Sequence, residues 1–208
     1  MIRPRPIPTA MALVAFGLIC PLIATILMTD SAPRAMENRG SSEVGLSAFR
    51  DVASVLTSPR CLNCHVEGQS PLQGDDGRPH SMNVRRGDDG RGSPAMRCTN
   101  CHQSTNIEFA HAPPGAPDWR LPAANSPMAW RGLSTGDLCR TLKDLSKNGG
   151  RSLSSLLEHV TADQIVNWGW NPGSGRTMPP LSHQQFVDKF REWVDSGAPC
   201  EPLVRTSP

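Results

Sequence analysis

The sequence is poor in aromatic residues: among 208 residues it has five Trp, five Phe and no Tyr. Proline and glycine are plentiful by comparison, with 20 and 18 residues. A chain of this length is expected to form one domain, or at most two small ones. Because few large side chains are available, side chains alone would give this domain only a thin apolar core.

The sequence also lacks an excess of charge of one sign. When Arg3, Arg5, Arg34 and Asp30 are set aside, the basic and acidic side chains of residues 36–208 are equal in number. A balanced domain is a poor partner for nucleic acid or for any other polyanion. Any surface that binds a partner protein must therefore be a local patch.

Only one long hydrophobic run is present, from Ala10 to Met28, and Arg3 and Arg5 precede it. Its length is typical of a short transmembrane helix and slightly exceeds the core of an ordinary signal peptide. No strong cleavage site follows, so residues 1–35 are expected to be either a signal peptide or an N-terminal anchor in the inner membrane. Either alternative exports the rest of the chain, residues 36–208, to the periplasm.

One hexapeptide occurs twice, as residues 60–65 (Arg-Cys-Leu-Asn-Cys-His) and residues 97–102 (Arg-Cys-Thr-Asn-Cys-His). Both copies contain Cys-x-x-Cys-His, the attachment motif of c-type haem. The two thiols bond to two vinyl groups on one edge of the porphyrin, so they must lie about one helical turn apart. The adjacent His supplies the proximal nitrogen to the iron.

The repeat therefore predicts two covalently bound haem c groups, which would also enlarge the thin core. The attachment residues are Cys61, Cys64, Cys98 and Cys101, and the proximal ligands are His65 and His102. The alternative is a zinc site, because two Cys-x-x-Cys pairs can supply four thiolates to one ion. The His that follows each pair and the expected export both favour haem.

The second face of a haem iron can bind His or Met, or stay open. We expect His80, in a polar Gly-rich loop, to serve one iron and His159, at the end of a short helix, to serve the other. Met178 is the main alternative, since its Arg-Thr-Met-Pro-Pro context resembles the loop that presents Met in single-haem class I cytochromes. The sequence leaves open which ligand serves which haem. Further alternatives are His111, Met82 and Met96.

Two cysteines of the exported part lie outside the motifs, Cys139 and Cys200. An exported domain is exposed to an oxidising compartment, where cysteine pairs form disulfides. We expect a Cys139–Cys200 disulfide that ties two helices together. The alternative is two free buried thiols.

Hydrophobic periodicity predicts one amphipathic helix before the first motif and several in the C-terminal third. Residues 66–96, rich in Gly and Asp, and residues 112–128, rich in Pro, are expected to be loops. Thr161 with Gln164 and Ser182 with Gln185 have the spacing of capping boxes. The predicted helices are 43–57, 134–147, 152–160, 161–168 and 182–195.

The fold class is therefore all-α and loop-rich. The second motif begins 37 residues after the first, which is too short for a complete single-haem domain between them. Residues 36–208 are expected to form one compact cytochrome c-like domain built around both haems. Trp119 and Trp130, in the Pro-rich segment, are expected to pack on haem.

The stretch from Cys61 to Cys200 resembles a group of small bacterial exported cytochromes that are often labelled isoquinoline 1-oxidoreductase subunit. The resemblance rests on three segments: residues 80–87 (His-x-Met-Asn-Val-x-Arg-Gly), 148–151 (Asn-Gly-Gly-Arg) and 193–200 (Trp-Val-Asp-x-Gly-Ala-x-Cys). It implies a redox partner protein, either a molybdenum hydroxylase or another dehydrogenase. No segment resembles a molybdopterin or iron–sulfur domain, so such catalysis would reside in another chain.

The sequence thus predicts an electron carrier without catalytic residues of its own. It would pass single electrons from its partner to a downstream acceptor. The alternative is a dihaem peroxidase-like enzyme with one open iron, for which Glu108 or His111 would supply acid–base chemistry.

Overall fold

The computed structural model describes residues 31–203, with side chains from residue 39 onward. The apolar run at residues 10–28, on which the prediction of a signal peptide or anchor rests, lies outside this range. Among the described residues, no helix is both long enough and apolar enough to cross a membrane. One compact unit begins at Arg39 and holds both Cys-x-x-Cys-His motifs.

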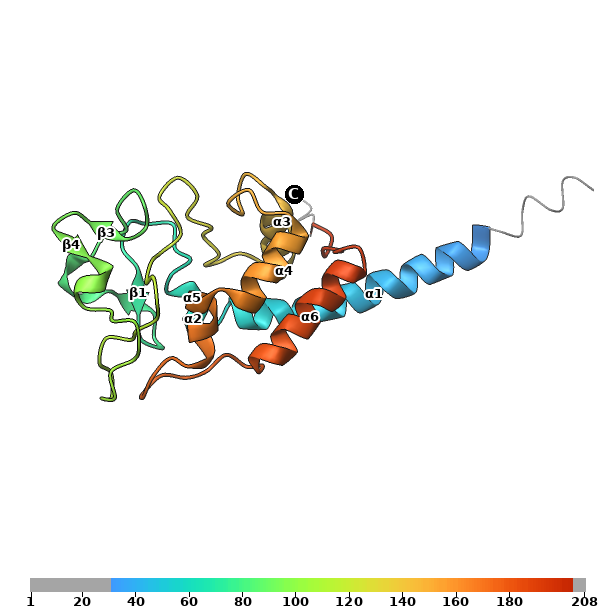
Figure 1. The fold of residues 1–208 in the computed structure, drawn as a ribbon. Helices are drawn as coiled ribbons and strands as arrows, with labels where there is room; N and C mark the ends of the chain where they lie inside the picture. The colour runs from blue at the N-terminus through green and yellow to red at the C-terminus, as the bar shows by residue number, and fades with distance from the viewer. Residues whose placement is uncertain (1–30, 204–208) are drawn as a thin grey trace, which may run out of the picture. The chain divides into compact units, whose positions relative to one another are not determined.

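The described part of the chain is mostly helical, as predicted, and its helices are joined by long loops (Figure 1). Two small antiparallel sheets pair β1 with β2 and β3 with β4 in the segment expected to be only loop. The α-helices within residues 31–203 are α1 (Ser31–Leu56), α2 (Pro59–Leu62), α3 (Thr135–Lys143), α4 (Leu153–Ala162), α5 (Gln164–Asn167) and α6 (His183–Asp195). The strands are β1 (Leu72–Gln73), β2 (Arg78–Pro79), β3 (Gly92–Ser93) and β4 (Met96–Arg97), and the 3-10 helices are η1 (Ser81–Asn83), η2 (Cys98–Asn100) and η3 (Trp168–Trp170).

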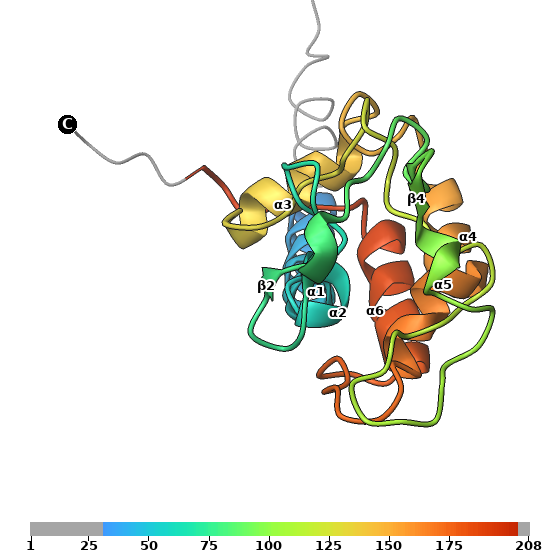
Figure 2. The same cartoon turned by 90° about the vertical axis from the view of Figure 1, so that its left-hand side faces the viewer.

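Helices α3, α4 and α6 gather toward one end of the compact unit, and β1 to β4 with their loops lie toward the other (Figure 1). Figure 2 views the molecule from the loop end, where the Pro-rich segment runs as an irregular, extended chain. Both Cys-x-x-Cys-His motifs are therefore outside the main helical core, in or next to this loop-rich part.

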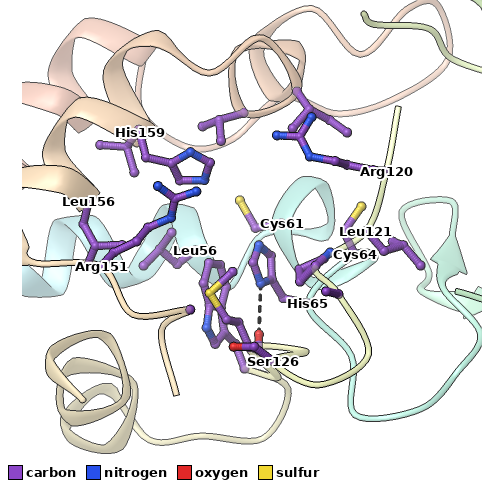
Figure 3. A pocket seen from close by; sticks show the side chains of 18 of the residues that line it. Leu56, Cys61, Cys64, His65, Arg120, Leu121, Ser126, Arg151, Leu156 and His159 are labelled. Atoms are coloured by element: carbon purple, nitrogen blue, oxygen red, sulfur yellow. Dashed lines mark hydrogen bonds between the residues drawn. The ribbon is translucent and has the colours of Figure 1, made fainter. Parts of the chain in front are cut away.

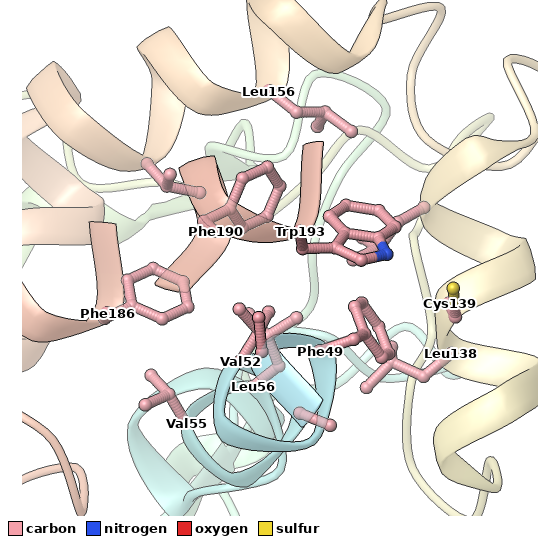
Figure 4. Packing of buried hydrophobic residues seen from close by; sticks show 14 of the residues in the cluster. Phe49, Val52, Val55, Leu56, Leu138, Cys139, Leu156, Phe186, Phe190 and Trp193 are labelled. Carbon is pink, nitrogen blue, oxygen red and sulfur yellow. The ribbon is translucent and has the colours of Figure 1, made fainter. Parts of the chain in front are cut away.

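The main core is formed by apolar side chains of α1, α3, α4 and α6 (Figure 4). The rings of Phe49 on α1 and Trp193 on α6 lie 4.7 Å apart between their centroids. Phe190 meets the same Trp193 ring edge-on, at 5.3 Å. Phe49, Phe190 and Trp193 are among the largest side chains that are fully buried, so these three rings supply much of the bulk of the core.

Helix α6 begins where the sequence predicts. The Ser182 side chain accepts a hydrogen bond from the Gln185 backbone N–H, and the Gln185 side chain accepts one from the Ser182 N–H, which completes the capping box. Phe186, Phe190 and Trp193 then fall on one buried face because they are spaced by three or four residues. The predicted helix and its predicted capping box are both confirmed.

Helix α3 begins at the predicted cap, Ser134, but ends at Lys143 rather than at Lys147. Asp144 stops it, because its carboxylate accepts hydrogen bonds from the backbone and the hydroxyl of Ser146 and holds a local turn. Leu145, which lies within the predicted helix 134–147, is outside α3 and is 59% exposed as a result. A side chain that competes for backbone hydrogen bonds has overridden the helical pattern.

Two other helix starts differ from the prediction. Helix α1 begins at Ser31, twelve residues before the start predicted at residue 43. The cap of α5 is Asp163, which accepts a hydrogen bond from the Ile165 N–H, and Thr161 instead belongs to the end of α4. The Thr161 capping box is wrong because its hydroxyl donates back to the Leu157 carbonyl within the helix.

A disulfide joins Cys139 on α3 to Cys200, just beyond the end of α6, which confirms the predicted pairing. It crosses 61 residues of sequence, and it ties together two helices that contribute to the same core. The Lys143 ammonium donates to the Ala198 carbonyl oxygen at 2.6 Å and reinforces the same junction.

Replacing both cysteines, Cys139→Ala with Cys200→Ala, should lower the free energy of unfolding by about 2–4 kcal/mol, because the unfolded chain loses a cross-link over a long loop. Urea unfolding followed by circular dichroism measures this loss. A reducing agent should lower the midpoint of the parent protein but not that of the double variant. Equal midpoints for parent and variant under oxidising conditions would contradict the expectation.

Candidate haem-attachment sites

The two Cys-x-x-Cys-His motifs have the same backbone turn. In the first, the backbone N–H groups of Cys64 and His65 both donate to the Cys61 carbonyl oxygen, each at 3.1 Å. In the second, the N–H groups of Cys101 and His102 both donate to the Cys98 carbonyl oxygen, at 3.2 and 2.9 Å. The repeat in sequence is therefore a repeat in structure. In both copies the two cysteines lie one helical turn apart, as haem attachment requires.

A cavity of about 730 Å³ opens beside the first motif (Figure 3). Cys61, Cys64 and His65 line it together with apolar side chains of the helical core, among them Leu156 and Phe190. Its volume is within the range of about 300–1,000 Å³ that is typical of cofactor sites. The main core thus stops at a space next to the first pair of thiols rather than filling it.

The two thiols of the first motif are uncharged. Burial raises the pKa of Cys61 to about 12 and that of Cys64 to about 11, because the thiolate form loses its water. This side of the cavity therefore presents neutral sulfur atoms.

His65 is held in the form of a metal ligand. Its Nδ1 lies 2.9 Å from the Met128 carbonyl oxygen. A carbonyl oxygen carries no hydrogen, so Nδ1 must be the donor and Nε2 keeps its free lone pair. Burial lowers the pKa of His65 to about 3, so the ring is neutral. The Trp130 ring stacks on it, with 3.4 Å between centroids and 5° between planes, and fixes its orientation.

His159 lines the same cavity from α4, and Figure 3 shows its ring across from that of His65. Its Nδ1 lies 3.3 Å from a carboxylate oxygen of Asp163, one helical turn further on. The same carboxylate accepts a hydrogen bond from Arg120 at 2.9 Å. The hydrogen bond from His159 is the main reason that the pKa of Asp163 lies well below its usual range. As in His65, Nε2 is the nitrogen left for a metal.

The second motif repeats this arrangement in the loop region. His102 Nδ1 donates to the Pro114 carbonyl oxygen at 2.7 Å, and the Trp119 ring stacks on His102 at 4.3 Å with 4° between planes. Burial lowers the pKa of His102, so this ring is also neutral. Cys98 is buried and Cys101 is exposed.

His80 faces His102. Its Nδ1 donates to the Ser81 carbonyl oxygen at 2.8 Å, which again leaves Nε2 free. The centroids of the His80 and His102 rings are 6.1 Å apart. A metal–imidazole bond is about 2 Å long and the ring centre lies about 1 Å behind the nitrogen, so a metal between two imidazoles separates their centres by roughly 6 Å. The spacing of this pair therefore fits one shared iron.

The other candidate ligands are placed differently. Met178 is 63% exposed and Met82 is 71% exposed, and neither lines the cavity of the first motif. Met96 and His111 are also exposed and outside that cavity. His183 uses the other ring nitrogen, since its Nε2 donates to the Val160 carbonyl oxygen at 2.8 Å.

The zinc alternative finds no support in the arrangement of the thiols. Within residues 31–203, no three His, Cys, Asp or Glu side chains are grouped so that they could hold a metal ion. The two Cys-x-x-Cys pairs thus do not converge on the tetrahedral site that structural zinc needs.

The polar atoms around the first cavity bear on the fit of haem, because haem has two carboxylates that need hydrogen-bond donors. Arg60 Nε, Ser126 Oγ and Trp130 Nε1 are buried without a hydrogen-bond partner in the described part of the protein, and all three residues line the cavity. The lining also includes the cationic side chains of Arg120 and Arg151. Buried donors without partners are costly unless a ligand satisfies them, so these residues fit an anionic, largely apolar group.

Arg86 is a structural residue of the site that sequence reasoning missed. Its side chain is 1% exposed and donates to the carbonyl oxygens of Val66 at 2.8 Å and Pro122 at 2.9 Å. It thus joins the segment after the first motif to the Pro-rich segment. Its one sequence signal is its place in the segment 80–87 that carries the family resemblance, whereas the role of Asp163 could have been found from its i, i+4 spacing to His159.

No protein-family model, curated protein or solved structure matches this chain. The case for a function therefore rests on the residues and geometry of the two sites.

Replacing the buried Arg86 with Met should lower the free energy of unfolding by about 3 kcal/mol, because buried carbonyl oxygens lose their charged donor. The neighbouring Arg85 is exposed, so Arg85→Met is the matched control and should change stability by less than about 0.5 kcal/mol. Chemical unfolding of both variants measures the difference. Equal losses at the two positions would show that Arg86 does not hold the loops together.

Proposed function

We propose that this chain is a small exported c-type cytochrome that carries two covalently attached haems. It transfers single electrons between a partner dehydrogenase or hydroxylase and a downstream acceptor. In this proposal the chain itself has no catalytic residues, and any catalysis belongs to the partner.

The observation that carries the proposal is the state of four histidines. His65, His80, His102 and His159 all have Nδ1 against an oxygen acceptor, which leaves Nε2 free to bind a metal. They form two pairs, one at each Cys-x-x-Cys-His motif. Such hydrogen bonds to Nδ1 are the usual support for histidine ligands, since they fix the tautomer and the ring orientation.

The residues divide between the sites accordingly. Cys61 and Cys64 would attach the first haem, with His65 as the proximal and His159 as the distal ligand. Cys98 and Cys101 would attach the second, with His102 as the proximal and His80 as the distal ligand. This assignment keeps both predicted distal histidines and makes Met178, which is exposed, the weaker alternative.

Bound haem supplies a reversible one-electron couple at iron. The protein's part is to orient the ligands, to shield the group from water and to balance its charge. The stacked Trp130 and Trp119 orient the two proximal rings. The apolar lining of the first cavity excludes water. The Arg60 Nε–H and the Ser126 hydroxyl, which have no partner among the described residues, would donate hydrogen bonds to the haem carboxylates.

The partner and the location follow from the sequence rather than from the geometry. Haem attachment and the Cys139–Cys200 disulfide both belong to an oxidising compartment, which supports export to the periplasm. The resemblance to cytochromes labelled isoquinoline 1-oxidoreductase subunit favours a molybdenum hydroxylase as the electron donor. Residues 10–28 would add an inner-membrane anchor if they are not cleaved.

A dihaem peroxidase is the weaker alternative, because that chemistry needs one iron with an open face. The two histidine pairs supply a ligand to both faces of both irons. The proposed acid–base residues also do not line the cavity of the first motif, since Glu108 and His111 are both exposed and outside it.

Protein exported from a host with haem-attachment machinery should retain two haems in a denaturing mass measurement. Changing Cys61 and Cys64 to Ser should leave one, and changing Cys98 and Cys101 to Ser should leave the other, because each pair of thioether bonds belongs to one group. A parent mass without any haem, together with bound zinc, would overturn the proposal.

The variants His80→Met and His159→Met should each raise the midpoint potential of one haem by on the order of 0.1 V, because a thioether stabilises ferric iron less than an imidazole does. Each should also add a sulfur-to-iron charge-transfer band. Spectroelectrochemical titration measures both changes. His183→Met is the control and should leave potentials and bands unchanged, since the His183 Nε2 is already bound to a carbonyl oxygen. Unchanged spectra in both test variants would refute the ligand assignment.

A further inference from the structure

Trp119 has a position that ligand binding alone does not explain. Its side chain is 9% exposed, although the Pro-rich segment that carries it is irregular. One face of the ring is stacked on His102, and the ring packs with Cys98 and Ala116 in a small hydrophobic cluster of its own. Trp119 therefore contacts both the proximal ligand and the buried attachment cysteine of the second motif.

The same ring also borders the first site. Trp119 lines the cavity that contains Cys61, Cys64 and His65. It meets the Trp168 ring edge-on at 4.8 Å, and Trp168 lines that cavity as well. Trp119 is thus in contact with the second site and at the wall of the first.

The backbone on both sides of Trp119 is anchored. Asp118 is ion-paired with Arg91 and Arg120, and Arg120 continues to Asp163, which holds His159. These links hold the ring in place relative to residues of both sites.

Trp130 provides a contrast within the same molecule. It stacks on the proximal His65 as Trp119 stacks on His102, and it also lines the first cavity. However, Trp130 packs into the main core and is not part of the cluster around Cys98. Stacking on a proximal histidine is therefore common to both tryptophans, whereas contact with both sites belongs to Trp119.

We infer that Trp119 is the packed bridge through which an electron passes between the two sites. The inference rests on the proposed function, because it needs a redox group at both motifs. One electron leaves the reduced site and reaches the oxidised site, so that one iron is oxidised as the other is reduced. No proton or atom moves. A densely packed aromatic ring mediates such a transfer better than the gap left by a smaller side chain.

The test uses Trp119→Leu in the full, haem-loaded protein. Pulse radiolysis injects one electron, and the haem absorption bands, assigned by freeze-quench electron paramagnetic resonance, follow its redistribution between the sites. We expect the inter-site rate to fall by roughly tenfold, since leucine leaves part of the ring's volume unfilled. Trp119→Phe keeps a stacked ring and should retain a rate within about threefold of the parent. Phe109→Leu, at an exposed ring near the same motif, is the control and should leave the rate unchanged.

Three readouts separate a bridge from a purely structural role. For the Trp119 variant, the mass under denaturing conditions must show two haems, and the electron paramagnetic resonance spectra must show unchanged ligands at both irons. Its two midpoint potentials must match those of the parent protein. If the leucine variant loses a haem, Trp119→Met takes its place, because it fills more of the volume without a ring. If the leucine or methionine variant keeps both haems and its inter-site rate equals that of the parent, the bridge role of Trp119 is overturned while the proposed function stands. A parent protein without two haems would overturn the proposed function as well.

Discussion

The hydrogen bond at Nδ1 of four histidines is the contact on which the rest of the site depends. An imidazole is a useful ligand only if it is neutral and if its free nitrogen points in one direction. Three backbone carbonyl oxygens, those of Met128, Ser81 and Pro114, and the Asp163 carboxylate lie against Nδ1 of the four rings, so that Nε2 is the nitrogen left for a metal. Stacked tryptophans add a second restraint on the two proximal rings, so the loops that carry these partners have to be fixed as firmly as the helices.

This requirement explains why a chain with so many irregular segments contains buried arginines. Arg86 donates to carbonyl oxygens on both sides of the first site, and Arg60, which is 5% exposed, pairs with Asp75 in the loop between the motifs. A buried guanidinium can satisfy several carbonyl oxygens at once, which regular secondary structure would otherwise do. The helical core and the disulfide stabilise one end of the compact unit, and these polar contacts stabilise the loop end, where the proposed haems would bind.

The two sites are related by a repeat but are not equivalent. The first lies against the helical core in a cavity of about 730 Å³, and its distal candidate is backed by a carboxylate. The second lies among loops, with an exposed cysteine and distal support from a carbonyl oxygen. A carboxylate partner makes an imidazole more basic than a carbonyl partner does. Burial would also change the relative energies of the oxidised and reduced forms of a bound haem iron. One motif used twice thus gives two different environments, which the proposed electron carrier would need for transfer in one direction.

The sequence by itself determined the helical class, the capping box at Ser182 and, by elimination, the disulfide pair. Its two Cys-x-x-Cys-His motifs are also the basis on which we predict haem attachment and the proximal histidines, because that chemistry depends on residue type at short spacing. It also identified His80 and His159 as candidate ligands without assigning either to a site. The tertiary structure decided which motif each of these two histidines lies beside, the stacking of Trp119 and Trp130 on histidine rings, and the burial of Arg86. It also corrected the end of α3 and the cap of α5, where side chains of Asp144 and Asp163 compete for backbone hydrogen bonds. These features bring together residues that are distant in the chain, and a spacing rule cannot report which loop carbonyl, ring or carboxylate will reach a given histidine.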